Sequence, residues 1–134
     1  MTTAVDSSVL LAIVNGETAG PAWESALAQA AGEGSLLISP VVYAELAAGF
    51  SDVALLDAEL ARLNIFYSPI EKPAAYAAGQ IFRAYRRAGG PRTHMIPDFL
   101  VAAHALHQAD RLAAIDRGYL RAYFPSLSLL AAMA

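Results

Sequence analysis

The 134-residue sequence contains no cysteine, which excludes disulfide bonds, thiol catalysis and metal sites built on cysteine. Charge is also sparse: Asp, Glu, Lys and Arg make up 16% of the residues, and Lys72 is the only lysine. The longest stretch without a charged residue spans 13 residues, 122–134, whereas a membrane-spanning helix needs about 20. No basic residue precedes the first apolar run, which argues against a secretion signal. We therefore expect a cytoplasmic protein with no membrane association.

The chain is rich in alanine, with 30 of 134 residues, and 57% of its residues are hydrophobic. This composition favours a helix-rich fold, and we expect one domain over residues 1–134 because no repeat or linker interrupts it. The net charge of −3 by itself argues against a nucleic-acid partner. The charge is unevenly distributed, however: residues 1–61 hold eight acids and no Lys or Arg, whereas residues 62–134 hold nine basic residues and four acids. A basic surface is therefore possible only in the second half of the chain.

Short apolar segments alternate with segments of helical pattern along the whole sequence. The expected strands cover 3–5, 36–39, 64–70, 111–115 and 127–130. The expected helices cover 7–15, 21–31, 41–49, 52–62, 73–88 and 98–109. Strands that are apolar throughout, alternating with helices, predict an α/β fold with a central parallel sheet covered by helices on both faces.

The helix expected over 73–88 has two different faces. Its apolar residues at the spacing of a buried stripe are Ala77, Ile81, Ala84 and Ala88. Arg83, Arg86 and Arg87 fall on the opposite side. These arginines form either an ordinary solvated surface or a patch that contacts phosphates, and the second interpretation requires a nuclease centre nearby.

Several common catalytic motifs are missing. The sequence has no glycine-rich phosphate-binding loop after a strand and no G-x-S-x-G motif. His104 and His107 have the i, i+3 spacing of helical metal ligands. We expect them instead to be partly exposed surface residues that point away from the acidic residues described next.

Four carboxylates stand at positions where a charge is unusual. Asp6 ends the first expected strand, Asp98 opens a helix and Asp116 ends the fourth expected strand. Glu45 is the only charged residue between positions 34 and 51. All four can reach the edge of a parallel sheet at which its strands end. Two such charges 4 Å apart repel by about 4 kcal/mol at an effective dielectric constant of 20, and a Mg²⁺ or Mn²⁺ ion would relieve that repulsion.

Each of these residues also has a purely structural explanation. Asp6 and Asp98 can cap helices, and Asp116 can belong to an ordinary turn. Ser8, like Ser7 beside it, can cap the first helix, or it can hold a metal-bound carboxylate or water in place. Glu45 is the hardest to explain structurally, because a lone carboxylate in a mostly apolar helix needs a partner.

The segments around these acids resemble the PIN-domain ribonucleases, and specifically the VapC-type toxins of type II toxin–antitoxin systems. The matching segments, in the order and spacing of that family, are 5–10, 39–46, 96–105, 116–119 and 123–125. The resemblance extends over essentially the whole chain. It implies a PIN-like α/β/α sandwich and endonucleolytic cleavage of RNA that depends on Mg²⁺ or Mn²⁺.

The resemblance also implies roles for individual residues. Asp6 and Asp98 would bind the metal directly, Glu45 and Asp116 would complete its surroundings, and Ser8 would support them. A metal-bound water would attack the phosphorus, and the arginine face of helix 73–88 would help to hold the RNA.

The family further implies a cognate VapB-type antitoxin and a homodimer or toxin–antitoxin hetero-oligomer. In such complexes an antitoxin arginine can compete with the metal. The chain departs from the family at Ala114, where Thr or Ser is usual, and the departure affects the role of Asp116 more than the fold.

Two other functions remain open at this point. One is another carboxylate–Mg²⁺ phosphoryl-transfer enzyme, although such enzymes use a strand-end lysine and Lys72 is the only candidate. The other is a catalytically impaired PIN-like binding module, which Ala114 makes conceivable.

Overall fold

The computed structural model describes residues 1–132 as an alternation of short strands and helices. In chain order these are β1 (Thr3–Val5), α1 (Ser7–Val14), α2 (Gly20–Glu33), β2 (Leu36–Ile38), α3 (Pro40–Ala47), α4 (Val53–Arg62), β3 (Ile65–Tyr67), α5 (Lys72–Arg87), α6 (Ile96–Gln108), β4 (Arg111–Ala113), α7 (Gly118–Tyr123) and β5 (Ser128–Leu130). None of the helices within residues 1–132 is long and apolar enough to cross a membrane.

The five strands form one parallel sheet in the order β3-β2-β1-β4-β5. Ala4 at the centre of β1 pairs with Leu37 of β2 and with Leu112 of β4. Val5 and Ala113 are also buried, because the central strands have neighbours on both faces. The predicted α/β fold with a central parallel sheet is therefore confirmed.

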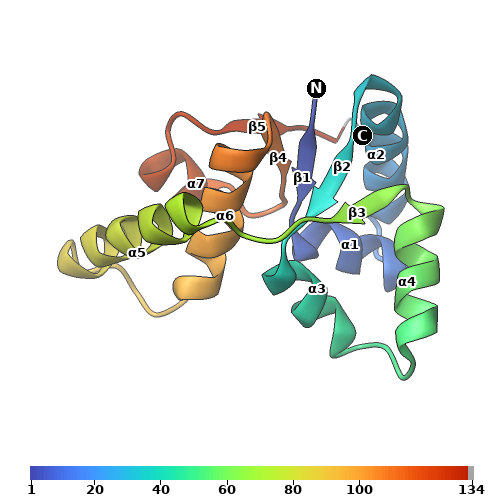
Figure 1. Cartoon of the computed structure of the whole chain (residues 1–134), viewed down its shortest axis with the longest axis horizontal. Helices are drawn as coiled ribbons and strands as arrows, with labels where there is room; N and C mark the ends of the chain where they lie inside the picture. Colours follow the sequence, from blue (N-terminus) through green and yellow to red (C-terminus); the bar gives the residue numbers. More distant parts are fainter. Residues whose placement is uncertain (133–134) are drawn as a thin grey trace.

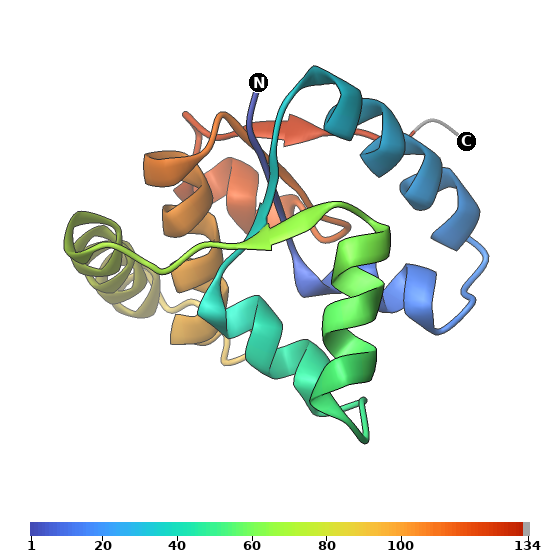
Figure 2. The same cartoon turned by 45° about the vertical axis from the view of Figure 1, so that its right-hand side comes forward.

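Helices cover both faces of this sheet and complete an α/β/α sandwich (Figure 1). Helices α5 and α6 lie on one side of the strands, and α1 and α2 lie on the other, as a second view also shows (Figure 2). Helix α7 joins the α6 side through aromatic contacts between Phe99 of α6 and Tyr119, Tyr123 and Phe124.

The strand order changes direction at β1. The chain passes from β1 to β2 and β3 on one side, and then returns to β4 and β5 on the other. Such a switch point leaves a crevice outside the carboxyl ends of the two central strands. Helices α1, α3 and α6 all begin at this end of the sheet (Figure 1). The topology therefore brings the residues after β1, after β4 and at three helix starts to one edge.

Three predictions about the elements need correction. The strand predicted over 64–70 covers only Ile65–Tyr67, and the strand predicted over 111–115 ends at Ala113. Helix α7 has no counterpart among the predicted helices, because its six residues are too few to show a helical period.

The buried face of α5 also differs from the predicted stripe. Its buried residues are Ala74, Ala78 and Tyr85, whereas Ala84 and Ala88 are exposed. Tyr85 carries its large ring into the aromatic core, in contact with Phe99 and Tyr123, and this contact rotates the helix. Arg83, Arg86 and Arg87 are nevertheless exposed, as predicted.

Candidate active site at the carboxyl edge of the sheet

Asp6 is the residue that joins β1 to α1. Its backbone is extended, and its carboxylate Oδ2 accepts hydrogen bonds from the Ser8 N–H at 3.3 Å and from the Ser8 hydroxyl at 2.5 Å. Asp6 therefore caps α1, as the structural explanation predicted. Burial raises the pKa of Asp6, the Ser8 hydrogen bonds oppose that rise, and the charge of Asp98 adds to it.

Ser8 links Asp6 to the segment after β4. Its Oγ donates to Asp6 and accepts the N–H of Ile115 at 3.3 Å. Asp116 follows immediately, so one hydroxyl connects the two central strand ends at the switch point. The supporting role of Ser8 in catalysis stays a prediction, which this contact motivates.

Glu45 lies on the second turn of α3, which begins at Pro40 with Ser39 as its cap. The Glu45 Oε1 atom accepts a hydrogen bond from the Ser7 hydroxyl at 3.0 Å. Partial burial of the carboxyl raises the pKa of Glu45; the Ser7 hydrogen bond lowers it, and the charges of Asp6 and Asp98 raise it again. Ser7 thus supplies the partner that a lone carboxylate in an apolar helix needs.

Asp98 belongs to the first turn of α6, which begins two residues earlier than predicted. Met95 is the capping residue, and its N–H donates to Asp98 Oδ2 at 2.9 Å. Pro97 fits the first turn because its missing N–H would have no partner there. The Asp98 side chain is still 39% exposed, so its carboxylate both caps the helix and faces solvent.

Asp116 lies in the connection between β4 and α7 and does not end the strand. Its side chain is 64% exposed. Two hydrogen bonds of Arg117 hold this connection: Nε donates to the Ala114 carbonyl at 3.1 Å, and Nη2 donates to the Leu130 carbonyl at 2.7 Å. The Asp116 side chain is therefore more exposed than that of Asp98, and Arg117 anchors the connection that carries it.

The phenol of Tyr119 is affected by the charges of all four acids. Burial raises the pKa of its phenol, and the negative charges of Asp6, Asp98, Asp116 and Glu45 raise it further. All four carboxylates are thus within electrostatic range of a single hydroxyl. The structure brings together the acids that the sequence placed at separate strand ends and helix starts.

His94 is a member of this cluster that the sequence analysis missed. Its Nδ1 atom lies 3.7 Å from Asp98 Oδ2, and its Nε2 atom lies 3.5 Å from Asp116 Oδ2. The imidazole stacks on the Tyr119 ring, with centroids 4.0 Å apart. The only signal in the sequence is its position four residues before Asp98, in a loop where no periodicity indicates a direction.

Only one of the two helical histidines lies on the surface as predicted. His107 is exposed, but the prediction that His104 is a partly exposed surface residue is wrong. His104 is 1% exposed, and its Nε2 lies 3.0 Å from the Ser68 hydroxyl just after β3. Burial lowers the pKa of His104.

The three arginines of α5 form an exposed basic strip. The guanidinium of Arg86 lies over the ring of Phe82, 5.9 Å from its centroid. Within residues 1–132, Arg83, Arg86 and Arg87 form no ion pair with an acidic side chain, so their charges are available to a partner. The loop over 88–95 connects this strip to His94 and α6.

The donor set fits a hard divalent cation. Carboxylate oxygens come from four different segments. Burial raises the pKa of Asp6 and Glu45, and repulsion by neighbouring carboxylates adds to the rise, so a cation would stabilise the charged forms. Among residues 1–132, no three acidic or histidine side chains are yet close enough together to hold an ion. Metal binding therefore requires these side chains to draw closer together.

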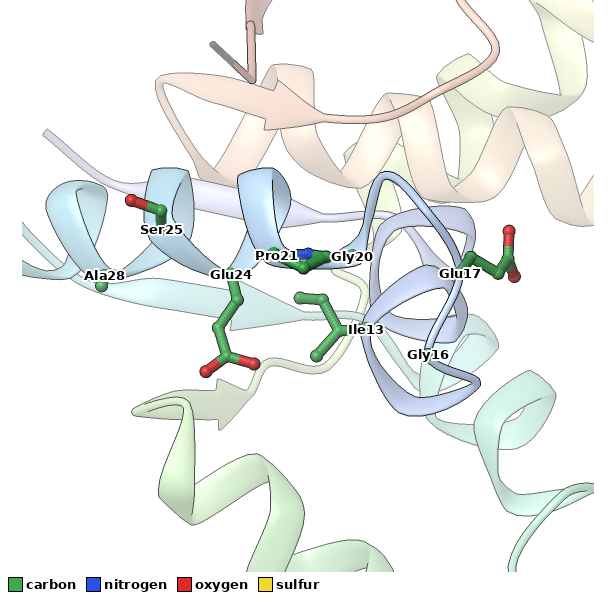
Figure 3. A pocket seen from close by; sticks show the side chains of 8 residues that line it. All are labelled: Ile13, Gly16, Glu17, Gly20, Pro21, Glu24, Ser25 and Ala28. Atoms are coloured by element: carbon green, nitrogen blue, oxygen red, sulfur yellow. The ribbon is translucent and has the colours of Figure 1, made fainter. Parts of the chain in front are cut away.

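A hollow of about 530 Å³ lies elsewhere, between the end of α1 and the start of α2 (Figure 3). Its lining is mostly small or apolar, and its two carboxylates, Glu17 and Glu24, point apart (Figure 3). Glu24 pairs with Arg62 at 3.0 Å. Because no polar groups converge in this hollow, the acid cluster is the better candidate for catalysis.

Comparisons with known proteins agree with this architecture. The family model described as PIN domain matches residues 3–125. No sequence among the curated proteins matches the chain.

Solved structures of toxin–antitoxin complexes have the same fold. VapBC2 from Rickettsia felis, bound to a DNA fragment from its promoter, is 18% identical with a TM-score of 0.73, over 96% of this chain and 97% of that one. VapBC-1 from nontypeable Haemophilus influenzae is also 18% identical, with a TM-score of 0.71 over 96% of both chains. A toxin–antitoxin complex from Klebsiella pneumoniae is 16% identical, with a TM-score of 0.66 over 98% and 99%.

Proposed function

Because this chain belongs to the PIN domain family, whose model matches residues 3–125, we propose that it is a metal-dependent endoribonuclease that acts as a cytoplasmic toxin. The observation that carries this proposal is the convergence of Asp6, Glu45, Asp98 and Asp116 around Tyr119 at the switch point. Drawn closer together, these carboxylates would hold a divalent ion, and phosphodiester hydrolysis is a reaction that such ions promote.

Asp6 and Asp98 are the proposed direct ligands of Mg²⁺ or Mn²⁺, and Glu45 and Asp116 complete the site. When bound, the ion supplies positive charge at the scissile phosphate and activates water. The side chains of the protein orient the groups that would bind the ion. Ser8 orients the Asp6 carboxylate, and Ser7 fixes Glu45 through its 3.0 Å hydrogen bond. These hydrogen bonds orient the two carboxylates before a cation binds.

RNA is the proposed substrate, and the strip formed by Arg83, Arg86 and Arg87 is its proposed backbone contact. These side chains are exposed and unpaired within residues 1–132, and they stand on the helix that leads into the His94 loop. Arginine neutralises phosphates and forms paired hydrogen bonds with them, which gives binding that weakens with salt.

A VapB-type antitoxin is the proposed partner of the chain, within a homodimer or a toxin–antitoxin hetero-oligomer. The structures described above as VapBC or toxin–antitoxin complexes support this proposal at the level of shared fold. An antitoxin arginine that enters the acid cluster would neutralise the same repulsion as a cation. Pull-down of the co-expressed product of the neighbouring reading frame tests this partner.

The nuclease activity is tested by incubating the purified chain with a panel of structured RNAs and Mg²⁺ or Mn²⁺. We expect cleavage by the wild type, and loss of cleavage with Asp6→Asn or Asp98→Asn. Glu17→Gln removes an acid outside the cluster and serves as the matched control, which should cut normally. A wild type that cuts no RNA, or Asn variants that cut as well as the wild type, would contradict the proposal.

A catalytically impaired binding module is the second candidate, and Ala114 favours it. The Ala114 side chain is buried and offers no hydroxyl beside Asp116, which is itself 64% exposed. An inactive wild type that still binds its antitoxin would support this second function. A phosphoryl-transfer enzyme is less favoured, because the single lysine, Lys72, begins α5 and contacts none of the four acids within residues 1–132.

A further inference from the structure

The imidazole of His94 faces two carboxylates of the site, one with each ring nitrogen. Nδ1 lies 3.7 Å from Asp98 Oδ2, and Nε2 lies 3.5 Å from Asp116 Oδ2. Neighbouring ligands of a six-coordinate ion stand about 3 Å apart, because metal–ligand distances are about 2.1 Å. The two observed nitrogen–oxygen distances therefore exceed the spacing of neighbouring metal ligands by less than about 1 Å.

The ring is held in this position by aromatic packing. It stacks on Tyr119 with an interplanar angle of 26°, and its edge meets the Tyr85 ring with centroids 6.3 Å apart. Only 20% of the His94 side chain is exposed. The ring therefore stays beside Asp98 and Asp116 and does not turn into solvent.

The loop that carries His94 is fixed to α5. The Tyr85 hydroxyl donates to the Pro91 carbonyl at 2.5 Å. Gly90 lies against the Tyr85 ring so closely that a Cβ there would come within 2.5 Å of it, and Gly89 has a positive φ of 81°. The position of His94 is thus set by the same buried tyrosine that contacts its ring.

We propose that His94 is a nitrogen ligand of the metal centre and that it shifts the preference of the centre from Mg²⁺ toward Mn²⁺. The inference depends on the proposed function, since it requires the carboxylates to hold a divalent ion. Mg²⁺ favours oxygen ligands alone, whereas imidazole nitrogen suits transition metals. Only one of the two nitrogens can bind a given ion; the other remains free to donate to the second carboxylate, as is usual for metal-bound histidine.

The test measures metal binding to the whole chain without RNA. Pulsed electron paramagnetic resonance of the Mn²⁺ complex detects a directly bound imidazole nitrogen, and Mg²⁺ affinity follows from competition. We expect the nitrogen signal in the wild type and in His107→Gln, an exposed histidine of α6 that serves as the matched control. In His94→Gln the signal should vanish and Mn²⁺ affinity should fall roughly 10- to 100-fold, with Mg²⁺ affinity unchanged.

The possible failures are distinguishable. If the wild type binds Mn²⁺ without a nitrogen signal, or if His94→Gln weakens both ions equally, the role of His94 is wrong and the proposed nuclease still stands. If the wild type binds neither ion, both proposals fail. If His94→Gln does not fold, a nitrogen signal in both the wild type and His107→Gln still assigns the ligand to His94, because the remaining histidine, His104, is buried.

Discussion

Ser8 donates its hydroxyl hydrogen to the Asp6 carboxylate at 2.5 Å and so fixes the acid that directly follows the central strand β1. The same oxygen accepts the Ile115 N–H from the segment after β4. One side chain thereby spans the two strands between which the sheet reverses its order. Asp6 and Ser8 therefore stand at the switch point of the sheet, where regular elements fix their backbone positions.

Removing this hydroxyl should weaken the site. Ser8→Ala deletes the hydrogen bond that orients the Asp6 carboxylate, so this ligand is held less firmly for a cation. We expect a roughly 10- to 100-fold loss of Mn²⁺ affinity, measured by titration of the whole chain. Ser25→Ala changes an exposed serine of α2 and should bind Mn²⁺ normally. Equal affinities in both variants would contradict the role of Ser8.

Two substitutions distinguish the effect of the Asp6 charge on stability from the effect of its helix cap. Asp6→Asn keeps an oxygen that can cap α1 and removes a repelling charge, so the metal-free melting temperature should stay the same or rise. Asp6→Ala removes the cap and should destabilise the protein by about 1 kcal/mol. Thermal melts in the presence of a chelator measure both effects. A clear drop for Asp6→Asn would mean that the carboxylate stabilises the fold through its charge.

The metal-free protein should lose stability as pH rises above the ordinary carboxyl range. The folded-state pKa values of Asp6 and Glu45 lie above their usual values of 3.8 and 4.5. The unfolded chain therefore releases these protons first, and the associated stability is present at low pH and is lost as pH rises through the folded pKa values. The free energy of unfolding in urea is measured for the wild type and for Asp6→Asn/Glu45→Gln at a series of pH values that starts in the ordinary carboxyl range and extends above it. The double variant should depend less on pH, and parallel curves would refute the assignment.

His104 should act in the opposite direction. Burial lowers its pKa from 6.5, so the unfolded chain binds a proton more readily, and the protein should lose stability as pH falls below 6.5. Urea unfolding above and below this pH compares the wild type with His104→Gln, whose stability should change less. His107→Gln should behave like the wild type, since that residue is exposed. An unchanged pH response in His104→Gln would show that another group is responsible.

Two glycine substitutions test the packing of the His94 loop. A Cβ at Gly90 would overlap the Tyr85 ring, so Gly90→Ala should destabilise the protein by about 1–3 kcal/mol and displace His94. Gly79 lies within α5 with open space around it, so Gly79→Ala should stabilise the protein by about 0.5–1 kcal/mol. Chemical denaturation checks both values. A neutral Gly90→Ala would mean that the loop moves aside without cost.

The α/β fold and the location of the site follow from local patterns. Asp6 directly follows a short apolar run, and such a run is buried in a parallel sheet whose carboxyl edge forms the ligand site. Asp98 directly precedes an apolar segment of helical pattern, which predicts that it lies at the start of a helix. The predicted position of Asp116 at the end of a strand is wrong, because nothing in the sequence marks the end of β4 at Ala113 rather than two residues later.

The apolar face of α5 shows the limit of periodicity. Alanines occur on several sides of this helix, so the spacing of Ala77, Ala84 and Ala88 was as regular as that of the residues that are buried. The burial of Tyr85 decided between these faces, because its ring fills the space beside Phe99. The side chains of two packed helices must fill the space between them, and the sequence of one helix alone does not show the shape of that space.

The sequence by itself determined the parallel sheet and the acidic and basic halves of the chain, and it predicts that four acids share one edge of the sheet. These properties depend on residues that are close together in the chain and on general rules of α/β topology. Only the tertiary structure decided that Ser7 holds Glu45, that His104 is buried against Ser68 and that His94 stacks on Tyr119 beside Asp98 and Asp116. Those contacts join side chains from separate elements, and their geometry is set by packing, which no local pattern contains.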